Sequence, residues 1–226
     1  MEAEPLLSGV VVDLQNRGVQ SVGSLVLHGD PADALPEAAT ALGADLLMLS
    51  SRGESGVRRA VMGSVAEHLL REAKTTAVMI SPATADMARD GEPMMRRIIL
   101  TLDGSETSEI ALPHAEHLAR VLQAELTLLR VDDEDDELKI AEAELRTHAA
   151  AMRSRGLDAI ATQTVRSEDP ATAILNSADL VGASLIVMAS HGRGGIGRLL
   201  LGSVADSVAR RTEQAAVLLV RSSPSE

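Results

Sequence analysis

Residues 185–205 read Leu-Ile-Val-Met-Ala-Ser-His-Gly-Arg-Gly-Gly-Ile-Gly-Arg-Leu-Leu-Leu-Gly-Ser-Val-Ala. The first four residues form a short apolar run, which is typical of a strand that is covered on both faces of its sheet. A loop with several glycines follows, and a helix is predicted to begin at Ser203. Open α/β sheets bind their ligands in loops of this kind, between the carboxyl end of a strand and the next helix. The stretch therefore predicts both a fold class and the position of a functional site.

The same pattern occurs earlier in the chain. Residue 30 aligns with residue 169, a shift of 139 positions, and the alignment continues without gaps. The matching segments are 30–32 with 169–171, 43–44 with 182–183, 53 with 192, and 63–66 with 202–205. A single register that matches so many glycines indicates the duplication of one unit.

Each copy alternates predicted strands with predicted helices, which favours right-handed crossovers and a parallel sheet. In the second copy we expect strands at 97–102, 126–131, 162–166, 185–188 and 216–220, and helices at about 106–123, at 170–181 and from 203. In the first copy we expect strands at 24–28, 46–49 and 77–80, and helices at 31 to about 42 and from 64. Pro31 and Pro170 suit a first helical turn, and Gly43 and Gly182 suit a C-terminal cap.

The two copies are unequal in length. The first has no counterpart of the first strand, first helix and second strand of the other copy. We therefore expect an incomplete α/β domain at 1–83, a polar linker at 84–95 and a complete α/β domain at 96–226. A shortened gene model accounts for this asymmetry more simply than a functional half-domain does.

The composition argues against several classes of partner. The chain has 226 residues, a net charge of −12, no cysteine and no Phe, Tyr or Trp. We expect no nucleic-acid partner, because such binding relies on Lys and Arg and, for single strands, on aromatic stacking. Without cysteine there is no disulfide and no thiolate site. No signal peptide and no membrane-length apolar run are visible, so a soluble cytoplasmic protein without membrane contact is expected.

The residues of the glycine-bearing loop allow two interpretations. In the first, the backbone approaches a phosphate, the free amides of the next helix bind it, and arginines add positive charge. The residues concerned are Gly192, Arg193, Arg198 and Gly202. In the second, Ser203 with Asp206, and Ser64 with Glu67, form capping boxes, which need no ligand.

The spacing Gly-x2-Gly-x9-Gly-Ser/Thr is the ATP-binding motif of the universal stress protein family, and this sequence resembles it. Here it reads Ala189-x2-Gly192-x9-Gly202-Ser203, and the segment Ile-Ile-Leu-Thr-Leu-Asp-Gly-Ser at 98–105 is similar to the opening of the same family. The resemblance covers the whole chain except the missing front of the first copy. It implies an open parallel five-stranded sheet of order 3-2-1-4-5, with ATP, alone or with Mg²⁺ or Mn²⁺, across strands 1 and 4. Ala189 departs from the motif, and its methyl group is tolerated if its φ is negative.

Carried over by position, the resemblance implies a set of nucleotide contacts. Asp103 would lie at the ribose or adenine with Thr101 close by, and Val131 would present its backbone to the adenine. The residues expected around the phosphates are Met188, Ala189, His191, Gly192, Arg193, Gly202, Ser203 and Val204. Among them, Gly202, Ser203 and Val204 would donate to the phosphates.

The first copy keeps only part of this motif. It reads Ser50-x2-Gly53-x9-Gly63-Ser64. Arg52 stands in place of the histidine, Glu54 adds a charge that repels phosphate, and the strand that carries the aspartate is absent. We expect no nucleotide in this copy.

Other candidate sites are weaker. His114 and His117 share a helix face but have no evident third metal ligand, and the acidic run 132–137 is best explained as a solvated loop. There is no P-loop motif and no general base beside the glycine-bearing loop, so at most weak ATP hydrolysis is expected. Three functions stay open: an ATP-binding regulatory or stress-response protein, an interaction scaffold of the same fold without nucleotide, and a nucleotide-using enzyme such as a slow ATP hydrolase.

The last predicted strand of each copy, at 77–80 and at 216–220, is apolar and uncharged. The family resemblance implies that each is an edge strand through which domains pair in antiparallel fashion. The strands missing from the first copy would leave its other edge open, and open apolar edges are usually covered. We therefore expect a homodimer through that edge, or else poor order over roughly the first 90 residues.

Overall fold

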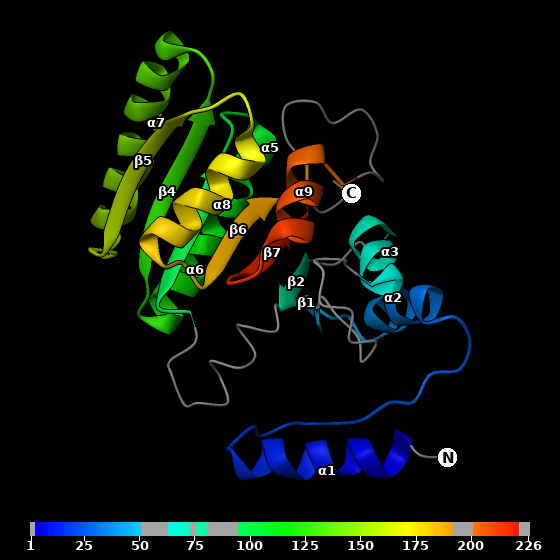
Figure 1. The fold of residues 1–226 in the computed structure, drawn as a ribbon. Coiled ribbons are helices and arrows are strands. Elements are labelled where there is room, and N and C mark those ends of the chain that lie inside the picture. Colours follow the sequence, from blue (N-terminus) through cyan, green and yellow to red (C-terminus); the bar gives the residue numbers. More distant parts are fainter. Residues whose placement is uncertain (1–2, 51–62, 73–75, 81–94, 192–200, 222–226) are drawn as a thin grey trace.

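One sheet of seven strands runs through the protein, in the order β1-β2-β7-β6-β3-β4-β5 (Figure 1). The structure is a computed structural model that describes residues 3–50, 63–72, 76–80, 95–191 and 201–221. The strands are β1 Leu46–Ser50, β2 Thr76–Ile80, β3 Arg97–Leu102, β4 Glu125–Asp132, β5 Ile160–Arg166, β6 Leu185–Ala189 and β7 Ala216–Val220. The linker predicted at 84–95 lies outside the described residues except for Met95.

The second copy forms the expected sheet. Its five strands lie in the order β5-β4-β3-β6-β7, and every neighbouring pair among them is parallel. Numbered within the copy this is the order 3-2-1-4-5, so the predicted fold class is confirmed. The first copy does not build a sheet of its own, because β1 and β2 continue this one. They join it where β2 pairs with β7 in antiparallel fashion, with Ala77 opposite Leu219 and Met79 opposite Val217.

Helices cover both faces of the second copy. One face carries α5 Glu106–Glu109, α6 Ala111–Leu122 and α7 Asp135–Ser154, and the other carries α8 Pro170–Val181 and α9 Ser203–Arg211, beside α3 Ser64–Glu72 of the first copy. The helix predicted at 106–123 is divided into α5 and α6. Pro113 explains the division, because it has no N–H to continue the hydrogen-bond ladder. Three alanines of α6, Ala111, Ala115 and Ala119, are buried against the sheet, where their small side chains allow close approach.

The signals for helix ends are confirmed in both copies. Asp169 caps α8 by accepting a 3.1 Å hydrogen bond from the Thr172 N–H, and Asp30 caps α2 (Pro31–Ala41) in the same way through Ala32. Gly182 ends α8 at φ 64°, and Gly43 follows the end of α2 at φ 61°. Both glycines have the left-handed backbone that a helix C-terminus needs and that other residues rarely adopt.

Two expectations for the first copy are wrong. Residues 24–28, predicted as a strand, are irregular. The strand next to which they would pair is one of those missing from this copy, and a strand without a partner leaves its backbone groups unpaired. The strand β1 was expected to be covered on both faces, but Leu46 is 43% exposed and Met48 is 62% exposed, whereas its counterpart β6 is buried throughout.

The helix α1 (Ala3–Asn16) was not predicted, and Figure 1 shows it apart from the sheet. The shift of 139 positions aligns Leu6 with Leu145 and Val10 with Ala149. In α7 those two residues are buried against β4 and β5, whereas Leu6 is 72% and Val10 is 50% exposed. The first copy has no strands equivalent to β4 and β5 among its described residues. The apolar stripe of α1 therefore has nothing there to pack against.

A cluster of one glutamate and two arginines ties α6 to the end of α7. Glu116 accepts hydrogen bonds of 2.9 and 2.5 Å from Arg155 and one of 2.8 Å from Arg120. Arg120 also donates to the Arg155 carbonyl oxygen at 2.7 Å. The hydrogen bonds from Arg155, supported by Arg120, lower the pKa of Glu116 from its ordinary value of 4.5 to about 2.

This cluster predicts a pH-dependent contribution to stability. A carboxylate whose pKa is lowered by folding stabilises the protein above its ordinary pKa and loses that effect as the pH falls toward the folded value. Glu116→Gln should lower the free energy of unfolding by about 1 kcal/mol at pH 7. The difference from wild type should shrink between pH 4.5 and about 2. Urea unfolding followed by circular dichroism at several pH values would measure it.

The matched control is Glu142→Gln, which removes an exposed ion pair with Arg146 one turn along α7. It should change the free energy of unfolding by less than about 0.5 kcal/mol. A Glu116→Gln difference that stayed constant from pH 7 down to pH 2 would contradict the assignment.

Candidate functional site

The carboxyl ends of β3 and β6 meet at a topological switch point. The two strands are parallel neighbours, with Leu100 opposite Val187. After β3 the chain passes to α5 and α6 on one face of the sheet, and after β6 it passes to α9 on the other face. Connections that leave in opposite directions open a crevice at the strand ends, and this is where open α/β sheets bind ligands.

The loop after β3 is held by a short network of hydrogen bonds. The Asp103 carboxylate accepts from the Ser105 N–H at 3.0 Å and from the Ser105 hydroxyl at 2.6 Å. Ser105 caps α5 by accepting from the Ser108 N–H at 3.1 Å, and the Ser108 hydroxyl accepts from the Asp103 N–H at 3.3 Å. The network fixes the half-buried Asp103 at the strand end, and Thr101 lies buried two residues before it.

The end of β6 is held through Ser190, which is only 1% exposed. Its N–H donates to the Val220 carbonyl oxygen at 2.8 Å, and its own carbonyl oxygen accepts from the Gly202 N–H at 2.8 Å. Its hydroxyl lies 2.9 Å from Nδ1 of His191. Ser190 thus joins the ends of β6 and β7 to the start of α9. It was not among the residues singled out from the sequence, although it lies inside the motif, between Ala189 and His191.

The helix α9 (Ser203–Arg211) begins where the sequence predicts, but its N-terminus contradicts the capping-box interpretation. Gly202 is the N-cap, at φ −61° and ψ 146°, and no side chain caps the helix. Ser203 is therefore the first helical residue, so it does not form a capping box with Asp206. The amides of Ser203 and Val204 occupy helical positions that have no helical carbonyl one turn earlier. Gly202 already donates its N–H to Ser190, so of the three amides predicted to donate to phosphate, those of Ser203 and Val204 are still suited to an anion.

An ion-pair cluster joins α9 to the first copy. Arg210 lies 2.9 Å from Asp206 on its own helix and 2.6 Å from Glu67 on α3. Hydrogen bonds with Asp206 and then Glu67 raise the pKa of Arg210 above its ordinary value. Both Glu67 and Asp206, which the sequence suggested as capping-box partners, pair with this arginine.

The other predicted site residues lie at the same edge of the sheet. Val131 is at the end of β4, and Met188 and Ala189 are buried at the end of β6. Ala189 is not among the residues with positive φ, so its methyl group meets the condition set by the motif. Gly192, Arg193 and Arg198 lie outside the described residues. The role of this whole set in binding remains a prediction.

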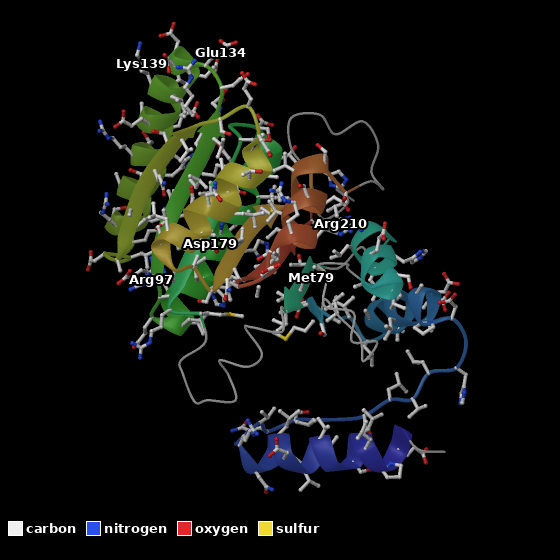
Figure 2. The ribbon with its side chains drawn as sticks, in the orientation of Figure 1. Met79, Arg97, Glu134, Lys139, Asp179 and Arg210 are labelled. Atoms are coloured by element: carbon white, nitrogen blue, oxygen red, sulfur yellow. The ribbon has the colours of Figure 1, made fainter. Side chains whose placement is uncertain are left out.

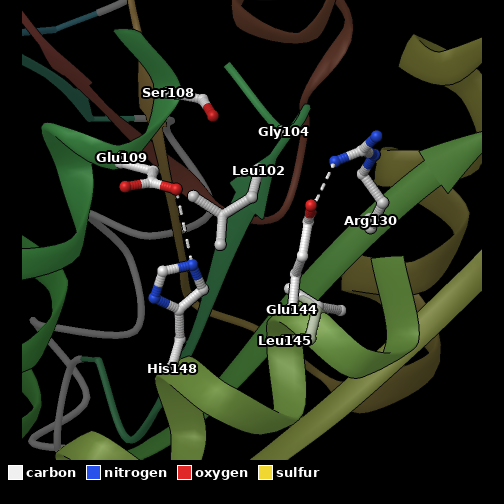
Figure 3. Close-up of a pocket in the computed structure, with 8 residues that line it drawn as sticks. All are labelled: Leu102, Gly104, Ser108, Glu109, Arg130, Glu144, Leu145 and His148. Carbon is white, nitrogen blue, oxygen red and sulfur yellow. Dashed lines mark ion pairs between the residues drawn. The ribbon is translucent and has the colours of Figure 1, made fainter. Parts of the chain in front are cut away.

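A buried arginine that the sequence did not reveal lies behind the β3 loop. Arg130 on β4 is 3% exposed, and its guanidinium lies 3.2 Å from Asp132 and 3.6 Å from Glu144. It borders a pocket of about 10 Å³, the space of roughly one water molecule, between α5, α7 and the end of β3 (Figure 3). The lining residues are Leu102, Gly104, Ser108, Glu109, Arg130, Glu144, Leu145 and His148. Figure 3 also shows the second ion pair of the pocket, between Glu109 and His148 at 3.6 Å.

The weaker candidates gain no support. Within the described residues there is no group of three or more His, Asp or Glu side chains that could hold a metal ion. The acidic run 132–137 is not the loop that was expected, because α7 begins at Asp135. Acidic residues at a helix start are favoured by the helix dipole. Among the helices that the structure describes, none is long and apolar enough to cross a membrane.

Comparisons with known proteins agree with the fold. The sequence model of the universal stress protein family matches residues 2–81 and 94–221. A universal stress protein of Mycobacterium tuberculosis is 27% identical over 199 residues, which are 83% of this chain and 65% of that protein. A universal stress protein of Bacillus subtilis is 31% identical over 149 residues, which are 57% of this chain and 100% of that protein.

A solved structure shows the same arrangement at the level of the whole chain. The crystal structure of a universal stress protein from Archaeoglobus fulgidus has a TM-score of 0.79 and 25% sequence identity, and the match covers 97% of this chain and 77% of that one. This chain spans about two thirds, 65%, of the length of the mycobacterial relatives that it matches.

Gly104 predicts a test of how tightly the β3 loop is packed. It has φ 78°, and a Cβ built on it would lie 2.2 Å from Nη1 of Arg130. Gly104→Ala should therefore lower the free energy of unfolding by about 1–2 kcal/mol for the left-handed backbone and by further energy for the contact. Gly156→Ala is the control, since Gly156 has φ 88° but its nearest neighbour, on Arg120, is 3.8 Å away. Urea unfolding that gave equal losses for the two variants would show that Arg130 does not restrict this loop.

Proposed function

This chain belongs to the universal stress protein family, and we propose that it binds one ATP in its second copy and acts as a regulatory or stress-response protein with little catalysis of its own. The observation that carries the proposal is the switch point, where Asp103 and the start of α9 lie at neighbouring strand ends. An aspartate suits the hydroxyls of a ribose, and the first amides of a helix suit phosphate. The two features match the two halves of a nucleotide.

The surroundings of α9 support phosphate rather than a cation. The amides of Ser203 and Val204 lie at the positive end of the helix dipole. His191 lies two residues after β6, with Nδ1 2.9 Å from the hydroxyl of Ser190, the residue that accepts from the Gly202 N–H at the start of α9. A Mg²⁺ or Mn²⁺ ion would be held chiefly by phosphate oxygens and water, as is usual for nucleotide-bound magnesium. Its contribution would be to neutralise phosphate charge.

Titration of the purified chain with ATP by calorimetry tests the proposal. We expect one site per chain, because only the second copy has both the aspartate strand and the complete motif. Gly202→Val should raise the Kd by at least about tenfold, since a branched side chain would stand beside the amides that face the phosphates. The protein should stay folded, because φ −61° and ψ 146° suit any residue.

The matched control is Gly63→Val, the corresponding change in the first copy. A Cβ at Gly63 has no neighbour within 4 Å, so the variant should fold and bind ATP as wild type does. Two equivalent sites, or no binding at millimolar ATP, would contradict the proposal. No binding would favour an interaction scaffold of the same fold.

We also propose that the pairing of β2 with β7 joins the two copies within one chain, and that the open edge of β1 pairs with β1 of a second chain. The residues of β1 are Leu-Leu-Met-Leu-Ser, without charge, and Met48 at the centre is 62% exposed. Edge strands of this kind are templates for pairing. Antiparallel pairing about a two-fold axis would use both open edges and leave no further β1 edge available.

Met48→Lys tests the homodimer. In such a pair the two copies of residue 48 lie opposite each other, and like charges directly opposite destabilise a strand pair. We expect wild type to elute as a dimer and Met48→Lys as a monomer in gel filtration with light scattering. Gln163→Lys, on the opposite edge strand β5, is the control and should stay dimeric. A monomeric wild type, or a dimer unaffected by Met48→Lys, would exclude this interface.

A further inference from the structure

We infer that Arg130 is a positioning residue for the nucleoside half of the site: its buried guanidinium fixes the Asp103 loop against the end of β4. The inference deepens the proposed ATP binding and rests on it. It concerns a residue that lies behind the crevice and is not one of the expected nucleotide contacts.

The location of Arg130 is unusual for a charged residue. Along β4, Leu126 and Leu128 are buried in the core beneath α6 and α7, and Arg130 continues that alternation onto the same face. Charged side chains are almost never fully buried unless they are paired. Replacing a buried ion pair by apolar residues of similar size is often neutral or stabilising. Stability alone is therefore a weak reason for an arginine at this position.

Its contacts join three separate elements. Nη2 lies 3.2 Å from Asp132 at the end of β4, and Nη1 lies 3.6 Å from Glu144 on α7. The guanidinium also fills the space beside Gly104, where a Cβ would lie 2.2 Å from Nη1 and 2.9 Å from Cζ. Gly104 directly follows Asp103, so the guanidinium packs against the loop that presents this carboxylate.

The hydrogen bonds that Arg130 does not make also support a positioning role. Its Nε is buried and has no hydrogen-bond partner among the described residues. A planar guanidinium offers five donors in a rigid fork. Here Nε has no partner, Nη2 bonds Asp132, and the end of the fork that carries Nη1 and Nη2 lies against Gly104. The arrangement favours the contact with the loop over complete pairing of the guanidinium.

The consequence concerns the two sides of the nucleoside subsite. Asp103 lies on the loop after β3, and Val131 lies on β4 directly after Arg130. In register, Arg130 is opposite Leu102 on β3. Because Arg130 touches the loop and is anchored to the end of β4 and to α7, it sets the separation between these sides. The phosphate subsite at α9 is held separately, through Ser190.

The test compares Arg130→Met with Arg155→Met. Both changes remove an arginine that pairs with a helical glutamate, Glu144 on α7 for Arg130 and Glu116 on α6 for Arg155. Arg155 lies at the C-terminal end of α7, whereas Arg130 meets that helix at its middle. Calorimetry measures the Kd for ATP and, separately, for inorganic tripolyphosphate, which has no nucleoside. Hydrogen exchange of the amides of residues 103–108, without ligand, reports the order of the loop.

We expect Arg130→Met to raise the Kd for ATP about tenfold or more and to leave the Kd for tripolyphosphate within about twofold. Exchange at residues 103–108 should be faster than in wild type. Arg155→Met should change none of the three readouts. If Arg130→Met does not fold, Arg130→Lys keeps the charge beside Asp132 but lacks the forked end that lies against Gly104, and it should show the same pattern to a smaller degree.

Three results would overturn the inference: an unchanged Kd for ATP, an equal loss of affinity for ATP and tripolyphosphate, or unchanged exchange at residues 103–108. If wild type binds no ATP, the proposed function fails, and the exchange measurement alone still decides whether Arg130 fixes the loop. Faster exchange in Arg130→Met but not in Arg155→Met would then support the positioning role without a nucleotide.

Discussion

The antiparallel contact between β2 and β7 is the interaction on which the first copy depends. A strand is stable only where its backbone groups find partners, and the first copy has two strands among its described residues. By pairing Ala77–Leu219 and Met79–Val217, β2 gains a complete five-stranded sheet as its neighbour, and β1 then pairs with β2. The ion pair between Arg210 on α9 and Glu67 on α3 connects the helices that lie over that contact (Arg210 is labelled in Figure 2). Without it, residues 76–80 and 46–50 would have only each other.

Local patterns in the sequence were enough to predict most of the second copy. The apolar runs of β3, β6 and β7, the Asp-Pro start of α8 and Gly182 each carry a signal that tertiary context did not override. Predictions failed where a segment would need a neighbouring strand that the described part of the first copy lacks. Residues 24–28 have the composition of a strand, but no described strand pairs with them. The helix α1 follows the pattern of α7, but the described part of the first copy has no counterparts of the strands on which α7 packs. The spacing of apolar residues predicts which face of a strand or helix is apolar, but it does not show whether another element packs against that face.

In the candidate site, too, local features could be predicted from the sequence and tertiary contacts could not. The motif located the strand ends and the start of α9, because glycine spacing reflects local backbone requirements. No sequence motif indicates the roles of Ser190 and Arg130, which hold the loops. Their roles arise from contacts between elements that are far apart in the chain. The helix α9 begins at Ser203 as predicted, but the alternative in which Ser203 caps it is wrong, because Gly202 is the N-cap and donates its N–H to Ser190.

The placement of β2 beside β7 has a consequence for synthesis on the ribosome. Chains emerge from the N-terminus and domains generally fold as they appear. Ala77 nevertheless pairs with Leu219, which is synthesised about 140 residues later. At the usual rates of translation the ribosome needs at least several seconds to add those residues. Until then the apolar segments 46–50 and 76–80 lack the sheet that completes them. This half of the protein can be finished only after the other half, so its nascent form is the stage most in need of chaperones.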